Sequence, residues 1–128
     1  MTCVIDSSAV IALLWDEPGS ELVSAATDGA LMSSVNASEV ALRLARDGAD
    51  PRPTIDDLLE LGIDIVDFTF TCGLRLMDLR QWEHRLHLTL SLGDRCCLAT
   101  AMDLGLPVLT ADREWLRFDD IVDVQLIR

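Results

Sequence analysis

Short apolar runs alternate with helical stretches from one end of this chain to the other, and this alternation restricts the fold more than any other feature. The runs with strand character are residues 2–5, 30–32, 63–68, 107–110 and 121–127. The helical stretches are residues 8–15, 18–27, 35–47, 54–61, 70–87, 94–105 and 112–116. Strands that alternate with helices build a mainly parallel sheet with helices on both faces. The sequence therefore predicts an α/β fold with three α/β/α layers.

The bulk properties of the chain fit one folded domain. A length of 128 residues favours a single domain, and an apolar content of 50% argues against disorder. No apolar run approaches the roughly 20 residues of a membrane span. The first residues, MTCVIDSSAV, include Asp6 and lack the basic start of a secretory signal. We expect one domain over residues 1–128, located in the cytoplasm, with no membrane contact.

The charge of the chain is strongly acidic. It has 22 acidic and 10 basic residues, a net charge of −12, and every basic residue is an arginine. A nucleic-acid binder usually has a basic surface, so nucleic acid contact here would need a local arginine patch or bound cations. A basic protein partner is the simpler inference from charge alone. The absence of lysine excludes the lysine of a P-loop and a Schiff-base lysine.

Neither the cysteines nor the histidines have the spacing of a zinc site. The cysteines are Cys3, Cys72, Cys96 and Cys97, which form no C-x-x-C pair, and adjacent residues on a helix point about 100° apart. We expect reduced, buried thiols. His84 and His87 are three residues apart on a helix and could share a metal, but no further zinc ligand is near in sequence. Exposed polar histidines are the favoured interpretation.

Four acids occupy positions that suggest a common site. Asp6 ends the first strand, Glu39 lies early in the helix over 35–47, Asp94 lies in the first turn of a helix, and Asp112 follows the strand over 107–110. Ligand sites of parallel sheets lie beyond the carboxyl ends of the strands. Clustered carboxylates repel one another unless a cation neutralises them, and oxygen ligands suit Mg²⁺ or Mn²⁺. The reaction class that follows is metal-assisted phosphodiester hydrolysis.

A structural explanation competes with the functional one for two of these acids. An acid at a helix start is usually a cap or a partner of the helix dipole, so Asp94 alone or Glu39 alone is more readily explained as structural. Asp6 is the stronger candidate, because folding does not require an acid at the end of an apolar first strand. Two hydroxyl residues, Ser8 and Thr110, lie close in sequence to the candidate acids.

Four segments contain the candidate acids and hydroxyls: VIDSSAVIALL (residues 4–14), SSVNASEV (33–40), LSLGDRCCLATA (90–101) and GLPVLTAD (105–112). Together they resemble the PIN-domain ribonucleases, and most closely the VapC-type toxins of type II toxin–antitoxin modules. The resemblance covers the chain from end to end and implies a single PIN domain over residues 1–128. It also implies that the four acids are catalytic and hold Mg²⁺ or Mn²⁺, with Ser8 and Thr110 as supporting hydroxyls, and that the activity is endoribonucleolytic cleavage of RNA.

The resemblance further implies a set of partners. A cognate VapB-type antitoxin would wrap the early helices and offer a basic side chain to the acids, and we expect Leu14 and Trp15 on the apolar helix over 8–15 to contact it. These toxins are commonly homodimers, and they reach operator DNA only through the antitoxin. The candidate phosphate contacts are Arg43, Arg46, Arg85, Arg95 and Arg113.

Several of these side chains have two possible roles. Arg95 and Arg113 each directly follow a candidate acid, so an ion pair that tunes the cluster is as plausible as an RNA contact. Trp15, Trp82 and Trp115 could stack on bases, although packing in a core or an interface is the commoner role of tryptophan.

Two other function classes compete with the ribonuclease. A PIN-like module without catalysis, acting only through protein partners, would not need four intact acids. A phosphatase of the haloacid-dehalogenase type would also place Asp6 at the end of the first strand. That family requires an aspartate where this chain has Ser8, and it uses a lysine, which this chain lacks.

Overall fold

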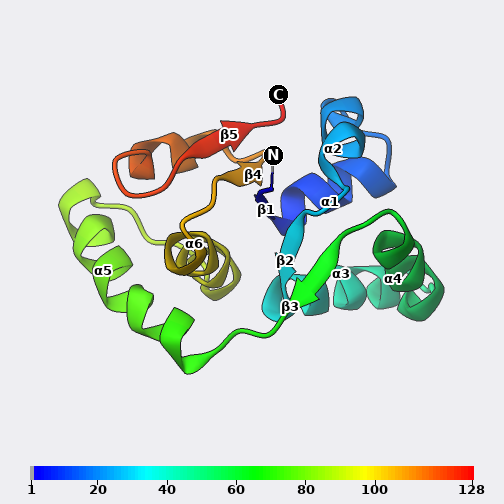
Figure 1. The fold of residues 1–128 in the computed structure, drawn as a ribbon, viewed down its shortest axis with the longest axis horizontal. Coiled ribbons are helices and arrows are strands. Elements are labelled where there is room, and N and C mark those ends of the chain that lie inside the picture. Colours follow the sequence, from blue (N-terminus) through cyan, green and yellow to red (C-terminus); the bar gives the residue numbers. More distant parts are fainter. Residues whose placement is uncertain (1) are drawn as a thin grey trace.

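A five-stranded parallel sheet forms the middle of the molecule in the computed structural model, which describes residues 2–128 (Figure 1). The strands are β1 (Val4–Ile5), β2 (Leu31–Ser33), β3 (Asp64–Val66), β4 (Val108–Thr110) and β5 (Val124–Leu126). They lie in the order β3-β2-β1-β4-β5, and every neighbouring pair is parallel. The predicted three-layer α/β/α architecture with a mainly parallel sheet is confirmed.

Helices cover both faces of this sheet. They are α1 (Ser7–Leu14), α2 (Ser20–Ala26), α3 (Ser34–Arg46), α4 (Pro51–Glu60), α5 (Phe70–Leu86) and α6 (Leu92–Leu104), with a 3₁₀ helix η1 (Arg113–Phe118) before β5. In Figure 1, α5 and α6 lie on one side of the sheet, and α1 to α4 gather on the other.

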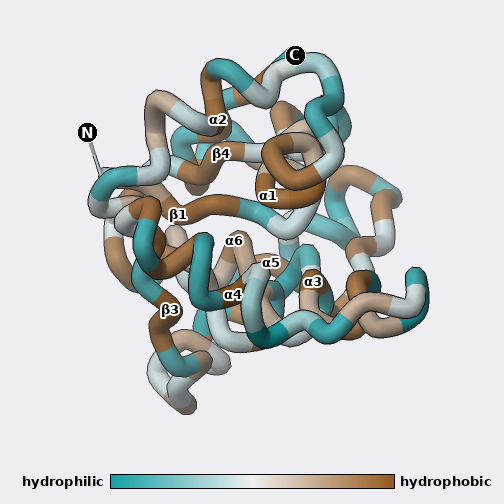
Figure 2. Tube along the Cα trace, turned by 90° about the vertical axis from the view of Figure 1, so that its right-hand side faces the viewer, coloured by the Kyte–Doolittle hydropathy of each residue, from teal (hydrophilic) through white to brown (hydrophobic). Residues whose placement is uncertain are grey.

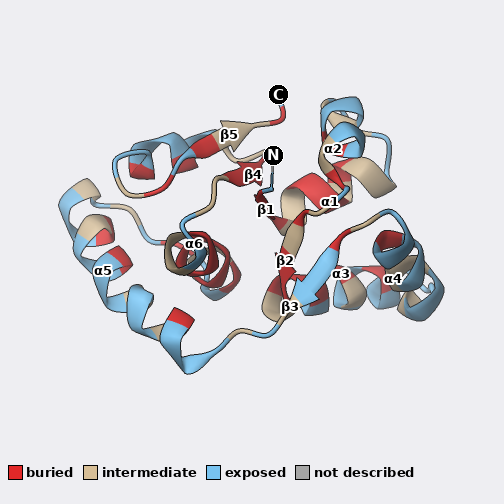
Figure 3. Ribbon diagram, in the orientation of Figure 1, coloured by how far each residue is buried: buried red, intermediate tan, exposed pale blue. Residues whose placement is uncertain are grey.

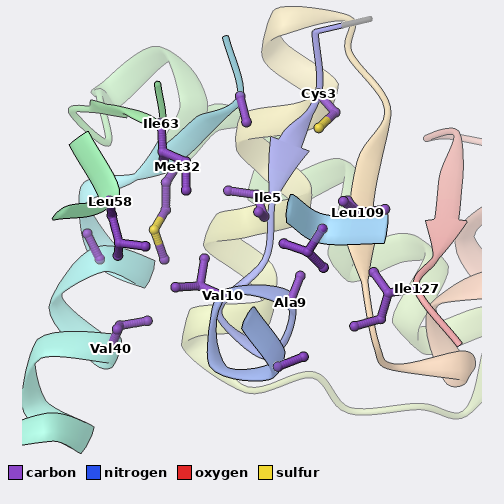
Figure 4. Packing of buried hydrophobic residues seen from close by; sticks show 14 of the residues in the cluster. Cys3, Ile5, Ala9, Val10, Met32, Val40, Leu58, Ile63, Leu109 and Ile127 are labelled. Carbon is purple, nitrogen blue, oxygen red and sulfur yellow. The ribbon is translucent and has the colours of Figure 1, made fainter. Parts of the chain in front are cut away.

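The strands divide their side chains between two hydrophobic cores. Val4 and Val108 pack in the core with α5, α6 and η1, whereas Ile5 and Leu109 pack in the core with α1 to α4. Figure 4 shows the second of these cores, where Val10 and Met32 lie near the strand residues. Successive strand residues point to opposite faces. A strand buried on both faces must therefore be apolar throughout, and β1 is hydrophobic along its length (Figure 2).

Helix α6 is the most deeply buried helix of the fold. Its residues from Cys96 to Ala101 are all buried, as Figure 3 shows, and Leu98 has no exposed surface. Its first turn nevertheless reaches solvent at Leu92. A rigid, buried helix with an accessible N-terminal turn is well suited to hold a functional side chain in a fixed position.

Two helices begin two or more residues earlier than the sequence predicts. Helix α4 begins at Pro51, because Asp50 caps it by accepting a bond from the Arg52 amide, and proline is tolerated in a first turn. The prediction that this helix begins at residue 54 is therefore wrong. Helix α6 begins at Leu92, because the Ser91 hydroxyl accepts a bond from the Asp94 amide and serves as the N-cap. Gly93 lies inside this helix and does not interrupt it.

The predicted strand over residues 121–127 is shorter in the structure. The Asp119 carboxylate accepts a bond from the Val124 amide, which ties residues 119–123 into a turn, and only Val124–Leu126 pair with β4. None of the helices within residues 2–128 is both long and apolar enough to cross a membrane.

The buried position of Leu98 gives a stability prediction. We expect Leu98→Ala to lower the free energy of unfolding by about 2–5 kcal/mol, because truncation leaves a cavity beside the sheet. Leu104→Ala, in the same helix but 44% exposed, is the matched control and is expected to cost much less. Urea unfolding measures both. Equal losses in the two variants would contradict the central role of α6 in the core.

Candidate functional site

The reversal of strand order places the site between β1 and β4. From β1 the chain builds β2 and β3 on one side and then crosses to build β4 and β5 on the other. Ligands of open parallel sheets bind at such a reversal, outside the carboxyl ends of the strands. Ile5 is paired with Leu109, so the residues that follow them, Asp6 and Thr110, lie side by side at this edge. Sequence alone predicts the edge but not which strands are neighbours.

The carboxylate of Asp6 is buried and held by two hydroxyls. Its Oδ2 accepts bonds from Ser8 Oγ at 2.6 Å and from Thr110 Oγ1 at 2.9 Å. Only 3% of Asp6 is exposed, and this burial raises its pKa, while the two hydroxyl bonds act in the opposite direction. Asp6 precedes α1 but its side chain does not cap that helix. The contacts of Asp6 with Ser8 and Thr110 therefore tie α1 to the end of β4.

The same two hydroxyls fix the loop that carries Asp112. Ser8 Oγ accepts a bond from the Ala111 amide at 3.0 Å, and Thr110 Oγ1 accepts one from the Asp112 amide at 3.1 Å. One oxygen of Asp112 accepts a bond from the Glu114 amide and caps η1. The capping role expected for acids at helix starts thus applies to Asp112, which keeps its second oxygen for other contacts.

Burial and the negative charges of the other three acids raise the pKa of the Asp94 carboxyl group. Its pKa is raised to about 6, mainly by burial, next by the negative charge of Asp6, and to a smaller extent by Asp112 and Glu39. A hydrogen bond with Ser91 opposes this rise. Electrostatic effects of this kind require short separations. The fold therefore brings all four predicted acids into one cluster, although they come from α3, α6 and two strand ends.

Glu39 is positioned by residues that sequence reasoning missed. Its Oε1 accepts bonds from Ser7 Oγ at 2.9 Å and from Asn36 Nδ2 at 2.8 Å. The same amide nitrogen of Asn36 donates to the carbonyl oxygen of Gly93 at 3.1 Å, which joins α3 to the first turn of α6. The spacing of Asn36 and Glu39, three residues apart on a helix, was the available signal.

Gly93 is the second missed residue. A Cβ atom at this position would overlap the Glu39 carboxylate, so only glycine allows the acid to lie against the first turn of α6. The position of Gly93, directly before a candidate acid, was the available signal of such a close approach.

The four carboxylates are gathered without forming a coordination sphere. No group of three or more histidine, cysteine, aspartate or glutamate side chains within residues 2–128 lies in an arrangement that could hold a metal ion. Oxygens of Asp6, Glu39 and Asp112 instead accept bonds from protein hydroxyl and N–H groups. The donor set consists of carboxylate and hydroxyl oxygens, which is the chemistry that Mg²⁺ and Mn²⁺ prefer.

The arginines that follow the acids do not pair with them. Arg95 donates to both oxygens of the buried Glu83, at 2.8 and 2.9 Å, and lowers the pKa of that carboxyl. Arg113 donates to the backbone oxygen of Arg128 and makes no ion pair with any acid in residues 2–128. The predicted tuning ion pairs are therefore not formed. A role of these arginines in RNA contact stays a prediction.

The structure also tests the expectations for the cysteines, the histidines and the tryptophans. All four cysteines are free and buried, and both histidines are exposed, as predicted. Trp115 is fully buried, so it cannot stack on a base, and Trp82 lies under the guanidinium of Arg85 at 5.0 Å. Of the remaining phosphate candidates, Arg43 lies 5.4 Å from the Trp15 ring and 3.7 Å from Asp47.

A hollow of about 300 Å³ lies between α1 and α3 and reaches the acidic cluster. It is lined by Ser7, Ile11, Glu39, Val40, Leu42, Arg43 and Arg46. Leu42 is 53% exposed, and Trp15 at the end of α1 is 39% exposed. Leu14 is half-buried and packs against the core, so it offers less surface than Trp15.

Comparison with known proteins identifies the family. Residues 3–121 match the model of the PIN domain, so the chain belongs to the PIN-domain family. No curated protein sequence matches significantly. Three similar solved structures are a toxin–antitoxin complex from Klebsiella pneumoniae, VapBC-1 from nontypeable Haemophilus influenzae, and VapBC2 from Rickettsia felis bound to a DNA fragment from its promoter.

The fold similarity extends over whole chains. The Klebsiella structure is 20% identical with a TM-score of 0.76 and 98% of each chain covered. The Haemophilus structure is 17% identical with a TM-score of 0.75, covering 99% of this chain and 98% of that one. The Rickettsia structure is 15% identical with a TM-score of 0.72 and 98% of each chain covered. At these identities the similarity establishes the fold.

The raised pKa of Asp94 predicts a pH-dependent cost of folding. The folded protein binds this proton more tightly than the unfolded chain, so stability falls as pH rises from about 4 to about 6, and the full cost remains above that. We expect Asp94→Asn to stabilise the protein at about pH 8 relative to wild type, with the gain shrinking toward about pH 4. Urea unfolding at both pH values measures it, and a gain independent of pH would contradict the prediction.

Proposed function

We propose that this protein is a metal-dependent endoribonuclease toxin that hydrolyses RNA phosphodiester bonds. The observation that carries the proposal is the cluster of four carboxylates at the strand reversal, in which three acids raise the pKa of Asp94. Such a cluster costs stability in the free protein, and a bound cation would offset that cost. Membership of the PIN-domain family, whose members are generally nucleases, supports the same reaction class.

Mg²⁺ or Mn²⁺ would be held by Asp6, Glu39, Asp94 and Asp112. When bound, the metal would supply an activated water and take negative charge from a phosphate oxygen. Ser8 and Thr110 hold one oxygen of Asp6 in place. Ser7 and Asn36 hold Glu39 in the same way through a single oxygen. Hydrogen bonds from protein groups thus orient Asp6 and Glu39.

An antitoxin is the partner that the α1–α3 hollow suits. Exposed Trp15 and Leu42 offer apolar contact, and Glu39 at the end of the hollow offers a carboxylate to a basic side chain. Several structures of similar fold are toxin–antitoxin complexes, and one is bound to promoter DNA. We therefore include a VapB-type antitoxin that covers the acids, with operator DNA bound through the antitoxin.

A homodimer is the expected assembly, and the outer face of α5 supports it. Phe70, Leu74 and Met77 share one side of this helix and are 83%, 51% and 69% exposed. Apolar residues at positions i, i+4 and i+7 of a helix usually face a hydrophobic core, yet these three are exposed to solvent in the single chain. Contact with a second copy would bury them.

A binding module without catalysis is the second candidate. The observation in its favour is that no three candidate ligands within residues 2–128 are arranged for a metal. Titration calorimetry with Mn²⁺ separates the two functions, because a module without catalysis needs no metal, whereas the nuclease requires binding that depends on Asp6.

The first prediction concerns Asp6. We expect Asp6→Asn to lower RNA cleavage by more than about 100-fold and to abolish growth arrest on expression, because it removes a charge at the centre of the cluster. Asp123→Asn, at an exposed acid far along the chain, should cleave like wild type. Circular dichroism checks that both variants fold. An Asp6→Asn protein that still cleaves RNA and arrests growth would contradict the proposal.

A side chain at Gly93 should affect activity more than it affects the stability of the fold. Gly93→Ala should displace the Glu39 carboxylate and lower activity by roughly 10- to 100-fold, while unfolding changes little because glycine is a poor helix former. Gly73→Ala in α5 is the matched control, since its nearest neighbour would be Phe68 at 3.8 Å. If both variants retain full activity, the packing of Glu39 on α6 has no role in catalysis.

A further inference from the structure

A second polar groove lies on the opposite side of α6 from the α1–α3 hollow. It has a volume of about 710 Å³ and is formed by α5, the loop after it and the first turn of α6. We call it the α5 groove. Its polar lining includes Arg80, Glu83, His84, His87, Thr89 and Arg95, and leucines from the same elements complete it.

The α5 groove is cationic in a chain that is otherwise strongly acidic. It collects two of the ten arginines and both histidines. Its single acid, Glu83, is buried and already paired with Arg95. An adjoining hollow shares Arg80 and His84 and adds Arg85, so the basic surface continues along α5. In a protein of net charge −12, an arginine without an acidic partner beside two histidines in one groove needs an explanation.

The polar groups of the α5 groove are available for a ligand. Arg80, His84 and His87 make no ion pair with any acid within residues 2–128. Arg80 and His84 are four residues apart on one side of α5, and His87 directly follows the helix, so the three side chains extend over about 10 Å. Arg95 uses one N–H of Nε and one of Nη2 for Glu83, which fixes its guanidinium and leaves three N–H donors.

The α5 groove adjoins the acidic cluster through α6. Leu92 and Arg95 line the groove, and Asp94 between them in sequence belongs to the cluster. Neighbouring residues on a helix point about 100° apart, so the first turn of α6 has the acids on one side and the groove on the other. A chain-like ligand with its reacting group at Asp94 would reach the groove within a short distance.

We propose that the α5 groove binds the sugar–phosphate backbone of single-stranded RNA beside the scissile bond. The inference rests on the proposed ribonuclease function and names the surface that holds its substrate. A row of donors suits a repeating polyanion better than a single anion, and the leucines among them suit nucleotide rings. Arg80 and Arg95 would then supply the local arginine patch that an acidic chain needs for RNA contact.

RNA binding by a cleavage-deficient protein tests the groove. In the Asp6→Asn background, anisotropy of a labelled single-stranded RNA oligonucleotide is measured over a series of NaCl concentrations with Mg²⁺ present. We expect Arg80→Gln to weaken binding by about 3- to 10-fold and to flatten the plot of log affinity against log salt by about 0.7, the loss of one phosphate contact. Arg80→Glu should weaken binding further, and a His84→Gln/His87→Gln double variant should also weaken it.

A matched control and a competitor complete the experiment. Arg52→Gln removes an exposed arginine of α4, across the sheet from the groove, and should bind RNA like its parent. Poly-glutamate of matched charge should compete poorly. Unchanged RNA affinity and salt slope in the Arg80 and histidine variants would overturn the groove, as would equal competition by poly-glutamate, which would favour an acidic protein segment.

The outcomes also separate the groove from the proposed function. If protein with Asp6 intact cleaves RNA and the groove variants bind RNA like their parent, the nuclease stands and the groove is wrong. If the intact protein cleaves no RNA while RNA binding still depends on Arg80, the nuclease is wrong and the groove is supported as an RNA site.

Discussion

The pairing of β1 with β4 is the constraint on which the rest of the structure depends. It sets Asp6 beside Thr110 and allows Ser8 to reach across to the Ala111 amide. A buried carboxylate is costly unless hydroxyls or N–H groups satisfy it, and here two hydroxyls do so. The elements that carry Glu39 and Asp94 then pack around this fixed point, with Asn36 joining α3 to α6.

The fold class and the four clustered acids could be predicted from the sequence, and the contacts between them could not. Alternating strands and helices determine a parallel sheet, and acids after two strands point to its carboxyl edge. Strand order depends on contacts between distant parts of the chain, so local sequence patterns could not predict that β1 pairs with β4 beside Asp6. The tuning role offered for Arg95 failed for the same reason, because Glu83 lies on another helix and no local pattern links the two.

The charge distribution resolves an apparent contradiction between composition and the proposed function. A net charge of −12 opposes RNA binding if the charge is taken as uniform. The site residues are separated in space: four carboxylates lie where a cation would bind, whereas two arginines and two histidines line the groove on the other side of α6. The acidic remainder would repel RNA from the other surfaces and so favour one orientation of the strand.

The candidate site combines residues that are far apart in the sequence, so it can form only after most of them have been synthesised. Thr110 follows Asp6 by 104 residues, so Asp6 is synthesised well before Thr110 and the Asp112 loop, which emerge from the ribosome later. Until then β1 lacks its β4 neighbour, and the buried carboxylate lacks one of its two hydroxyl donors. A nascent or truncated chain therefore cannot assemble the site. For a protein that would attack RNA, this delay would protect the message and the ribosome that produce it.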